Sequence, residues 1–190
     1  AQFEIPAHRW ADLSEPGAGL AILNDCKYGH AALHDELSVS LLRGTRDPDP
    51  DADLGEHSFT IALMPHAGDW AAARVVDEAA ALNRPLLPLD TADAPDAPIL
   101  AVAHDDSLRG RAVVDAVKPA EDSRDILLRL YESLGGAARV TITPGFRAEA
   151  ARERNALEDD LGPLTLAPYG SLTLELKPFQ LRTVSLTPGA

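Results

Sequence analysis

The clearest pattern in the chain is an alternation of apolar and polar residues near its carboxyl end. Leu172, Leu174 and Leu176 alternate with polar residues, which places the three leucines on one face of an extended segment. A period of two is typical of a half-buried antiparallel strand, so we predict a strand over 171–176. Similar short runs, bounded by Gly, Pro, Asp and Asn, predict further strands at 19–23, 37–43, 57–64, 111–118, 125–132, 139–143 and 179–186.

Two glycines lie between the predicted strands 125–132 and 139–143. Gly135 and Gly136 can adopt the positive φ angles that a tight turn requires. We therefore expect these two strands to form a hairpin. With the preceding segment 111–118, they would make a three-stranded antiparallel meander.

Two segments depart from the strand pattern. Apolar residues recur at helical spacing over 70–82 and stop at Asn83-Arg84-Pro85, so we predict one short helix there. Segment 147–161 is rich in Ala, Glu and Arg and also favours a helix, although its apolar face is thin. Segment 88–98 is mostly Pro, Asp and Ala, which predicts a loop or linker.

Together these elements predict a mostly β fold, an antiparallel β-sandwich of roughly ten strands with one or two short helices. The 190 residues suffice for one domain, or for one domain and part of another. The chain begins without methionine or a signal peptide, so we expect it to start inside a longer polypeptide. By itself it would then expose an apolar face or an unpaired strand edge, which favours a homo-oligomer.

The charge balance excludes two classes of partner. Asp and Glu outnumber Lys and Arg by 30 to 17, giving a net charge of −13 and an isoelectric point near 4.7. Such a surface repels nucleic acid and anionic lipid, so we predict neither as a partner. No apolar run approaches the roughly 20 residues of a membrane span. The single cysteine, Cys26, excludes an internal disulfide and is expected to be a buried, inert thiol.

The most polar stretch is segment 46–57, where Asp or Glu recurs at nearly every second position. Oxygen ligands in this pattern could bind Ca²⁺, but the spacing of an EF-hand is missing and two prolines stiffen the segment. A solvated surface loop is the favoured interpretation, and contact with a partner domain or a sugar is the alternative. Six histidines lie scattered without the spacing of zinc ligands, so we predict no metal site in this chain.

A second polar segment, 24–29, follows directly on the predicted strand 19–23. It carries an amide, a carboxylate, an ammonium group and a phenol at a strand end, where binding sites often lie. Such groups suit hydrogen bonding to sugar hydroxyls, with the phenol stacking on a sugar ring. The alternative is a turn in which Asn24 or Asp25 binds its own backbone and Lys27 pairs with a nearby acid.

The segments 24–29 and 51–57 open on the same rim if the strands 20–23 and 59–63 are neighbours. They would then contact a sugar together, or both would only brace a domain interface. We predict no catalytic residue in this chain. The candidates for substrate binding are Asn24, Asp25, Lys27, Tyr28, Asp53 and His57.

Six blocks of sequence form a more specific combination than any single motif. They are FEIPAHRWADLSEPGAGLAILNDCKYGH (3–30), LSVSLLRG (37–44), DPDPDADLGEHSFTIALMPHAGDW (47–70), ALNRP (81–85), AVKPAEDSRDILLRLYES (116–133) and LTLELKPFQLRTVSL (172–186). In content and order they closely resemble the carboxyl-terminal β region of family 38 glycoside hydrolases, the α-mannosidases. The resemblance is strongest to the branch that includes the cytosolic and vacuolar enzymes and many bacterial ones.

This resemblance implies a function that the chain does not perform alone. Family 38 enzymes carry their zinc, aspartate nucleophile and acid/base on an amino-terminal α/β-barrel, and nothing here matches the barrel's motifs. Residues 1–190 then form a carboxyl-terminal β-sandwich portion that has no cofactor of its own, packs on the zinc-containing barrel and shapes the cleft for a mannose-containing oligosaccharide. A cytoplasmic location is expected. The alternative is a free-standing carbohydrate-binding or structural module.

The resemblance also bears on two local predictions. In relatives, loops of this region close over the mouth of the active site, and the D-x-G loop is the best candidate here. Leu54 lies in that loop where related enzymes often carry a polar residue, which weakens a direct sugar contact from that position. The family prefers strand to helix over 147–161.

Overall fold

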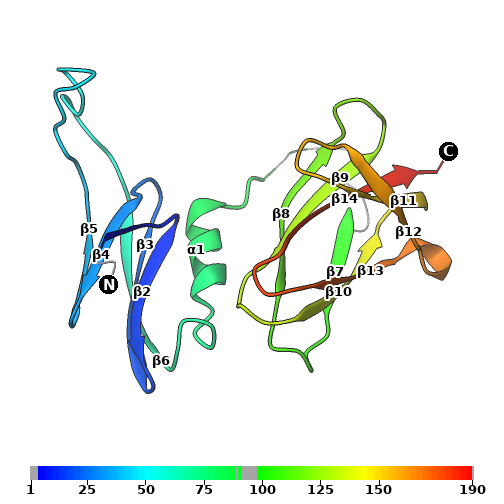
Figure 1. The fold of residues 1–190 in the computed structure, drawn as a ribbon, viewed down its shortest axis with the longest axis horizontal. Helices are drawn as coiled ribbons and strands as arrows, with labels where there is room; N and C mark the ends of the chain where they lie inside the picture. Colours follow the sequence, from blue (N-terminus) through cyan, green and yellow to red (C-terminus); the bar gives the residue numbers. More distant parts are fainter. Residues whose placement is uncertain (1–3, 89, 91–97, 190) are drawn as a thin grey trace. The chain divides into compact units, whose positions relative to one another are not determined.

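The computed structural model describes residues 4–88, 90 and 98–189. The chain divides into two compact units, Ala1–Leu89 and Asp90–Ala190 (Figure 1). Strands dominate both units, and the strand pairs are antiparallel. The described residues contain one α-helix and one short 3₁₀ helix. The prediction of a mostly β, antiparallel fold with one or two short helices is therefore confirmed.

The first unit holds two three-stranded sheets and the α-helix (Figure 1). One sheet has the order β2-β3-β6, with the bounds Trp10–Glu15, Ala18–Asn24 and Ile61–Ala67. The other has the order β1-β4-β5, with the bounds Glu4–Pro6, Gly29–Leu33 and Glu36–Val39. Within the described residues β1 pairs only with β4 and is exposed along its length, so its other edge is open.

Helix α1, Val75–Asn83, contacts β3. Its buried Val75 and Ala79 join Ala21 and Leu23 in a small apolar core. The helix is confirmed, but it begins five residues after Trp70, where the spacing pattern starts. The reason lies in the preceding turn, because the Asp69 carboxylate accepts the backbone N–H of Ala72 at 2.8 Å and holds the chain before α1 in a turn.

The second unit is a β-sandwich (Figure 1). One sheet has the order β12-β11-β14-β9-β8, with the bounds Asp160–Leu164, Ala148–Arg154, Leu181–Pro188, Ile126–Glu132 and Ala112–Pro119. The other has the order β13-β10-β7, with the bounds Leu172–Leu176, Ala138–Pro144 and Leu100–His104. Fully buried leucines of β9 and β13, among them Leu128 and Leu174, share one core, so burial of the predicted apolar faces holds the sandwich together.

The predicted hairpin at Gly135–Gly136 is wrong. β9 pairs with β8 and β14, whereas β10 pairs with β7 and β13 in the other sheet. The connection crosses between sheets because the buried carboxylate of Glu132 accepts backbone N–H groups from Leu134 and Gly135 at 2.7 and 2.8 Å. It also accepts the N–H groups of Arg111 and Phe179, so the end of β9 is held by distant segments rather than by a returning strand.

The helical tendency of 147–161 is overridden. The segment forms β11 and the start of β12, as the family resemblance predicts. β11 pairs with β12 on one side and with β14 on the other, and its Ala148 and Ala151 are buried. Backbone hydrogen bonds on both edges and burial of these small side chains outweigh a helix preference of a few tenths of a kcal/mol per residue.

Two predicted strands near the start have different bounds in the structure. The strand expected over 37–43 ends at Val39, and the strand expected over 57–64 begins at Ile61. The predicted loop 88–98 falls mostly on residue 89 and residues 91–97, which lie outside the described residues. The 3₁₀ helix η1, Pro168–Gly170, was not predicted and follows β12.

Candidate functional site

The pairing of β3 with β6 determines where the two predicted binding segments lie. The register sets Asn24, the last residue of β3, opposite Ile61, the first residue of β6. The segment that follows β3 and the segment that precedes β6 therefore leave the sheet at the same end. We call these segments, residues 24–29 and 51–60, the rim. The expected neighbourhood of the two strands is confirmed.

Asn24 is buried beneath the exposed residues of the rim and holds its first turn. Its side chain is only 1% exposed, and its Oδ1 accepts the backbone N–H of Lys27 at 2.6 Å. Its backbone carbonyl accepts a hydrogen bond from Nδ2 of Asn83 at 3.0 Å, which joins the rim to the end of α1. The amide thus shapes the turn, as the alternative interpretation of this segment proposed for Asn24 or Asp25, and it does not reach the exposed surface.

Asp25 links the two halves of the rim. Its Oδ2 accepts the backbone N–H of Thr60 at 2.9 Å. A hydrogen bond from the Cys26 thiol and the one from Thr60 lower the pKa of Asp25, so the carboxylate is charged at neutral pH. Cys26 is exposed, which contradicts the predicted burial, because it lies after the end of β3 in a bend whose neighbour Asp25 is exposed as well. The hydrogen bond to Asp25 raises the pKa of the thiol and keeps it in the unreactive protonated form.

Lys27 and Tyr28 both contact aromatic rings, whereas the turn interpretation paired Lys27 with a nearby acid. Nζ of Lys27 lies 4.5 Å from the centroid of the Phe59 ring, a cation–π contact across the rim. The Tyr28 side chain is 54% exposed, and its ring lies 4.7 Å from that of His8, tilted by 50°. The rim thus offers the Tyr28 phenol to solvent, whereas Lys27 is half-buried with its ammonium group over the Phe59 ring.

Asp53 and His57 form the other half of the rim. Asp53 has a positive φ of 64°, and its Oδ2 accepts the backbone N–H groups of Gly44 and Arg43 at 2.8 and 3.1 Å. These hydrogen bonds lower the pKa of the Asp53 carboxyl. Nε2 of His57 lies 3.0 Å from the backbone oxygen of Asp53. Leu54 between them is exposed. Asp53 therefore closes its own loop, and His57 stands beside it at the surface.

The rim has no metal chemistry of its own. Within the described ranges, no three His, Cys, Asp or Glu side chains come together in a way that could hold a metal ion. The residues present do not fit the zinc that the family resemblance implies for the whole enzyme, and no catalytic step follows from them. Helix α1 has nine residues, and the described part of the chain contains no helix long and apolar enough to cross a membrane.

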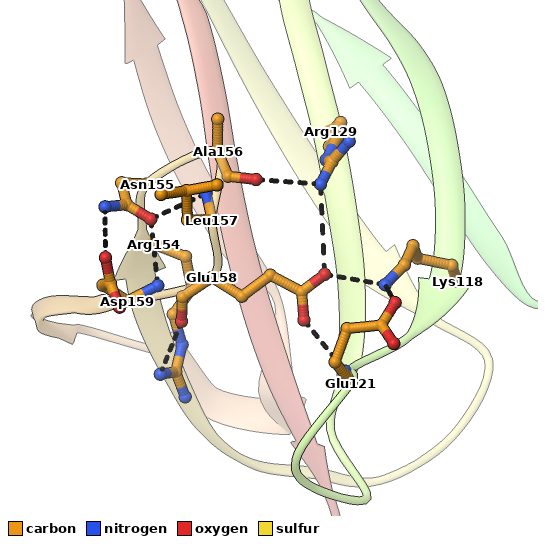
Figure 2. Close-up of polar contacts among 9 residues, drawn as sticks. All are labelled: Lys118, Glu121, Arg129, Arg154, Asn155, Ala156, Leu157, Glu158 and Asp159. Atoms are coloured by element: carbon orange, nitrogen blue, oxygen red, sulfur yellow. Dashed lines mark hydrogen bonds and ion pairs between the residues drawn. The ribbon is translucent and has the colours of Figure 1, made fainter.

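A second polar cluster, in the other unit, was missed by sequence reasoning (Figure 2). Figure 2 shows the carboxylate of Glu158, which accepts hydrogen bonds from Nζ of Lys118 at 2.7 Å and from the backbone N–H of Glu121 at 2.9 Å. The Arg129 guanidinium lies 3.9 Å from Glu158 and donates to the carbonyl of Ala156 at 3.1 Å. Only the spacing of Lys118 and Glu121 could have signalled any part of this cluster.

The acidic and basic groups of this cluster stabilise one another, which indicates a structural role. The hydrogen bond from Lys118 lowers the pKa of Glu158, and the hydrogen bonds to Glu121 and Glu158 raise the pKa of Lys118. Each group thus stabilises the charged form of its neighbour. The contacts tie the β11–β12 turn to the β8–β9 turn, so we interpret the cluster as a clamp on the sandwich rather than a reactive centre.

Comparison with known proteins places the chain in one family. The C-terminal domain of glycosyl hydrolases family 38 matches residues 1–51, and the C-terminal beta sandwich domain of the same family matches residues 111–184. Alpha-mannosidase 2C1 of Homo sapiens is 43% identical over 98% of the chain, and Alpha-mannosidase G of Dictyostelium discoideum is 34% identical over 96%.

The fold is also found in a solved structure. A glycosyl hydrolase family 38 protein from Enterococcus faecalis has a TM-score of 0.69 over 97% of this chain at 19% identity. The chain spans 18% and 17% of the human and Dictyostelium relatives and 22% of the Enterococcus chain. From the family matches and these identities, the chain belongs to glycosyl hydrolase family 38 and corresponds to the C-terminal region of its members.

Proposed function

We propose that the chain works as the non-catalytic C-terminal β region of an α-mannosidase. The observation that carries this proposal is the 43% identity to an α-mannosidase over 98% of the chain. In this proposal the zinc and the carboxylates that cleave the mannoside lie in the catalytic barrel of the same enzyme, in the cytoplasm. The chain packs on that barrel, and its contribution to hydrolysis is to shape the cleft for a mannose-containing oligosaccharide.

The rim is the part of the chain best suited to that cleft. It combines an exposed phenol at Tyr28, an ammonium group at Lys27 and the imidazole of His57 within two segments that share one sheet end. A phenol can stack on a sugar ring, while an ammonium group and an imidazole can hydrogen-bond to hydroxyls. Held in place, such groups would orient the sugar for attack by the barrel's nucleophile.

The acids of the rim have a different role in this proposal. The carboxylates of Asp25 and Asp53 already accept backbone N–H groups of Thr60, Gly44 and Arg43. Since these bonds fix the shape of both loops, we assign bracing to the two aspartates and to Asn24. Sugar contact is assigned instead to the half-buried Lys27 and to the exposed Tyr28 and His57.

The experiment compares single variants of an α-mannosidase that contains this chain. We expect Tyr28→Ala and Lys27→Ala each to lower kcat/KM for an oligomannoside about tenfold at an unchanged melting temperature. Leu33→Ala is the matched control, because this exposed leucine lies at the opposite end of β4 from Tyr28. A lowered melting temperature with normal kcat/KM for Tyr28→Ala would assign the whole rim to bracing and overturn the sugar contact.

A further inference from the structure

Tyr169 has an unusual backbone conformation in the second unit. It lies inside η1 with φ 70° and ψ 11°, in the left-handed region that bulky residues rarely adopt. Glycine or asparagine would adopt this conformation with less strain. The Tyr169 side chain is also fully exposed, so no part of the described chain packs against its ring.

Nothing in the turn itself requires a tyrosine. The two hydrogen bonds that close it join backbone atoms, from the N–H of Ala167 to the carbonyl of Ser171 at 2.8 Å and from the N–H of Gly170 to the carbonyl of Ala167 at 3.0 Å. Any side chain would leave both bonds intact. A tyrosine at this position is therefore unfavourable for two reasons, its left-handed backbone and its exposed aromatic ring. Backbone outliers of this kind concentrate where a ligand is bound.

The ring lies at the border of an open depression of about 680 Å³. This volume falls within the roughly 300–1,000 Å³ of small-molecule sites. Small residues line it, so the backbone is close to the surface: Gly145, Ala148, Ala167 and Gly170. A Cβ atom on Gly170 would lie 3.4 Å from the backbone nitrogen of Ala148, so η1 rests against the start of β11.

Two charged side chains line the same depression, Arg147 and Glu149. Both are exposed, and both lie beside Gly189, where a Cβ atom would be 3.3 Å from Cδ of Arg147 and 3.1 Å from Oε1 of Glu149. Among the described residues, neither side chain has a hydrogen-bond or ion-pair partner. A guanidinium only donates and a carboxylate only accepts, so together they offer both kinds of hydrogen bond next to an aromatic face.

We propose that this depression binds one pyranose ring of an oligosaccharide, with Tyr169 as the stacking platform. The C–H groups on one face of a pyranose carry partial positive charge and meet the negative face of the phenol ring. The hydroxyls at the edge of the sugar then meet Arg147 and Glu149. The site lies in the second unit and does not depend on the role proposed for the rim.

The test measures binding of methyl α-D-mannopyranoside and of an α-linked mannotriose to the 190-residue chain by NMR. We expect the amide signals of 145–149 and 167–170 to shift on titration. Tyr169→Asn, which suits a left-handed backbone, should weaken binding about tenfold, the scale of losing one stacked ring. Phe179→Ala is the matched control, because Phe179 is also aromatic, exposed and at a positive φ of 57°, but does not line this depression.

Three results would overturn the inference. The first is binding that survives Tyr169→Asn and disappears in Tyr28→Ala, which would place the sugar on the rim. The second is unchanged binding in both variants. The third is the absence of any shift at millimolar sugar, together with protection of the Tyr169 ring from solvent in a longer α-mannosidase, which would make the depression a protein contact. Loss of the rim's effect on kcat/KM would leave this binding test unaffected, so the two proposals fail separately.

Discussion

The carboxylate of Asp12 and the imidazole of His66 form a buried pair in the β2-β3-β6 sheet. Oδ2 of Asp12 lies 2.7 Å from Nε2 of His66, and the two side chains are 3% and 4% exposed. The hydrogen bond to Asp12 raises the pKa of His66, although burial alone would lower it. Because the histidine gains this partner only in the folded state, its raised pKa makes the stability of the first unit sensitive to pH.

We expect the His66–Asp12 pair to stabilise the chain most at acidic to neutral pH. The folded pKa of His66 lies above its unfolded value of about 6.5, so the contribution is complete below that pH and is lost as the pH rises through the folded pKa. The melting temperature of the native chain minus that of His66→Gln should therefore fall as the pH is raised above the unfolded value of about 6.5. A difference that grows with pH would contradict this, and the NMR titration of His66 checks its pKa directly.

Gly19 should tolerate no side chain. The imidazole of His66 lies over it, and a Cβ atom would come 2.6 Å from Cβ of Ser14. Gly19→Ala is expected to lower the free energy of unfolding by about 1–3 kcal/mol, as overpacking does, measured by urea denaturation. Gly17→Ala is the control, since a Cβ there meets nothing within 4 Å. Equal effects of the two substitutions would show that the contact with His66 is unimportant.

The second unit should be destabilised even by an isosteric replacement of Glu132. Burial raises its pKa, but four backbone N–H groups lower it overall, and the side chain is 1% exposed. In Glu132→Gln one oxygen becomes an NH₂ group that faces N–H donors, so we expect the free energy of unfolding to fall by about 2–4 kcal/mol. Glu175→Gln, at an exposed ion pair with Arg139, should change it by less than about 1 kcal/mol. Comparable losses would refute the special role of Glu132.

By itself the chain should hydrolyse no mannoside and bind no stoichiometric zinc. The described residues offer no metal-binding group of three or more His, Cys, Asp or Glu, and the proposed function assigns the chemistry to the barrel. A chromogenic α-mannoside and metal analysis of the purified chain provide the test. Turnover in proportion to bound zinc would disprove the assignment of catalysis to the barrel alone.

The open edge of β1 should promote self-association of the chain. Ile5 in this strand is 40% exposed, and an unpaired edge of this kind can pair with another chain. Sedimentation velocity should show a concentration-dependent oligomer that Ile5→Lys reduces. Leu157→Lys, at a leucine of the other unit that is even more exposed, should leave the oligomer unchanged. A monomer at all concentrations would contradict the expectation.

Local patterns predicted the elements well where neighbours in sequence are also neighbours in space. The alternation of leucines gave β13, and the spacing after Trp70 gave α1. The crossing after β9 could not be predicted, because Glu132 binds the N–H groups of residues 21 positions before it and 47 positions after it. The extended form of 147–161 depends on pairing with β14, which no propensity of the segment itself encodes.

The candidate site was predicted in part for the same reason. The neighbourhood of the two rim segments follows from adjacent strands, and the register confirms it. The buried Asn24 accepts the backbone N–H of Lys27 and a hydrogen bond from the distant Asn83, and the second of these contacts cannot be found from the local sequence. In the sequence, Tyr169 resembles any other tyrosine after a proline, since its left-handed backbone is set by the turn around it.

The four N–H groups gathered by Glu132 have a consequence for how the second unit folds. They come from chain segments before β8, after β9 and before β14, so the carboxylate has all its partners only when these three segments have converged. In a partly assembled sandwich the Glu132 carboxylate would be buried with too few N–H donors. Alternatively it would stay hydrated, and its water would keep the two sheets from packing together. Half-formed intermediates are thereby disfavoured relative to the complete sandwich, so this one side chain makes the folding transition of the unit more cooperative.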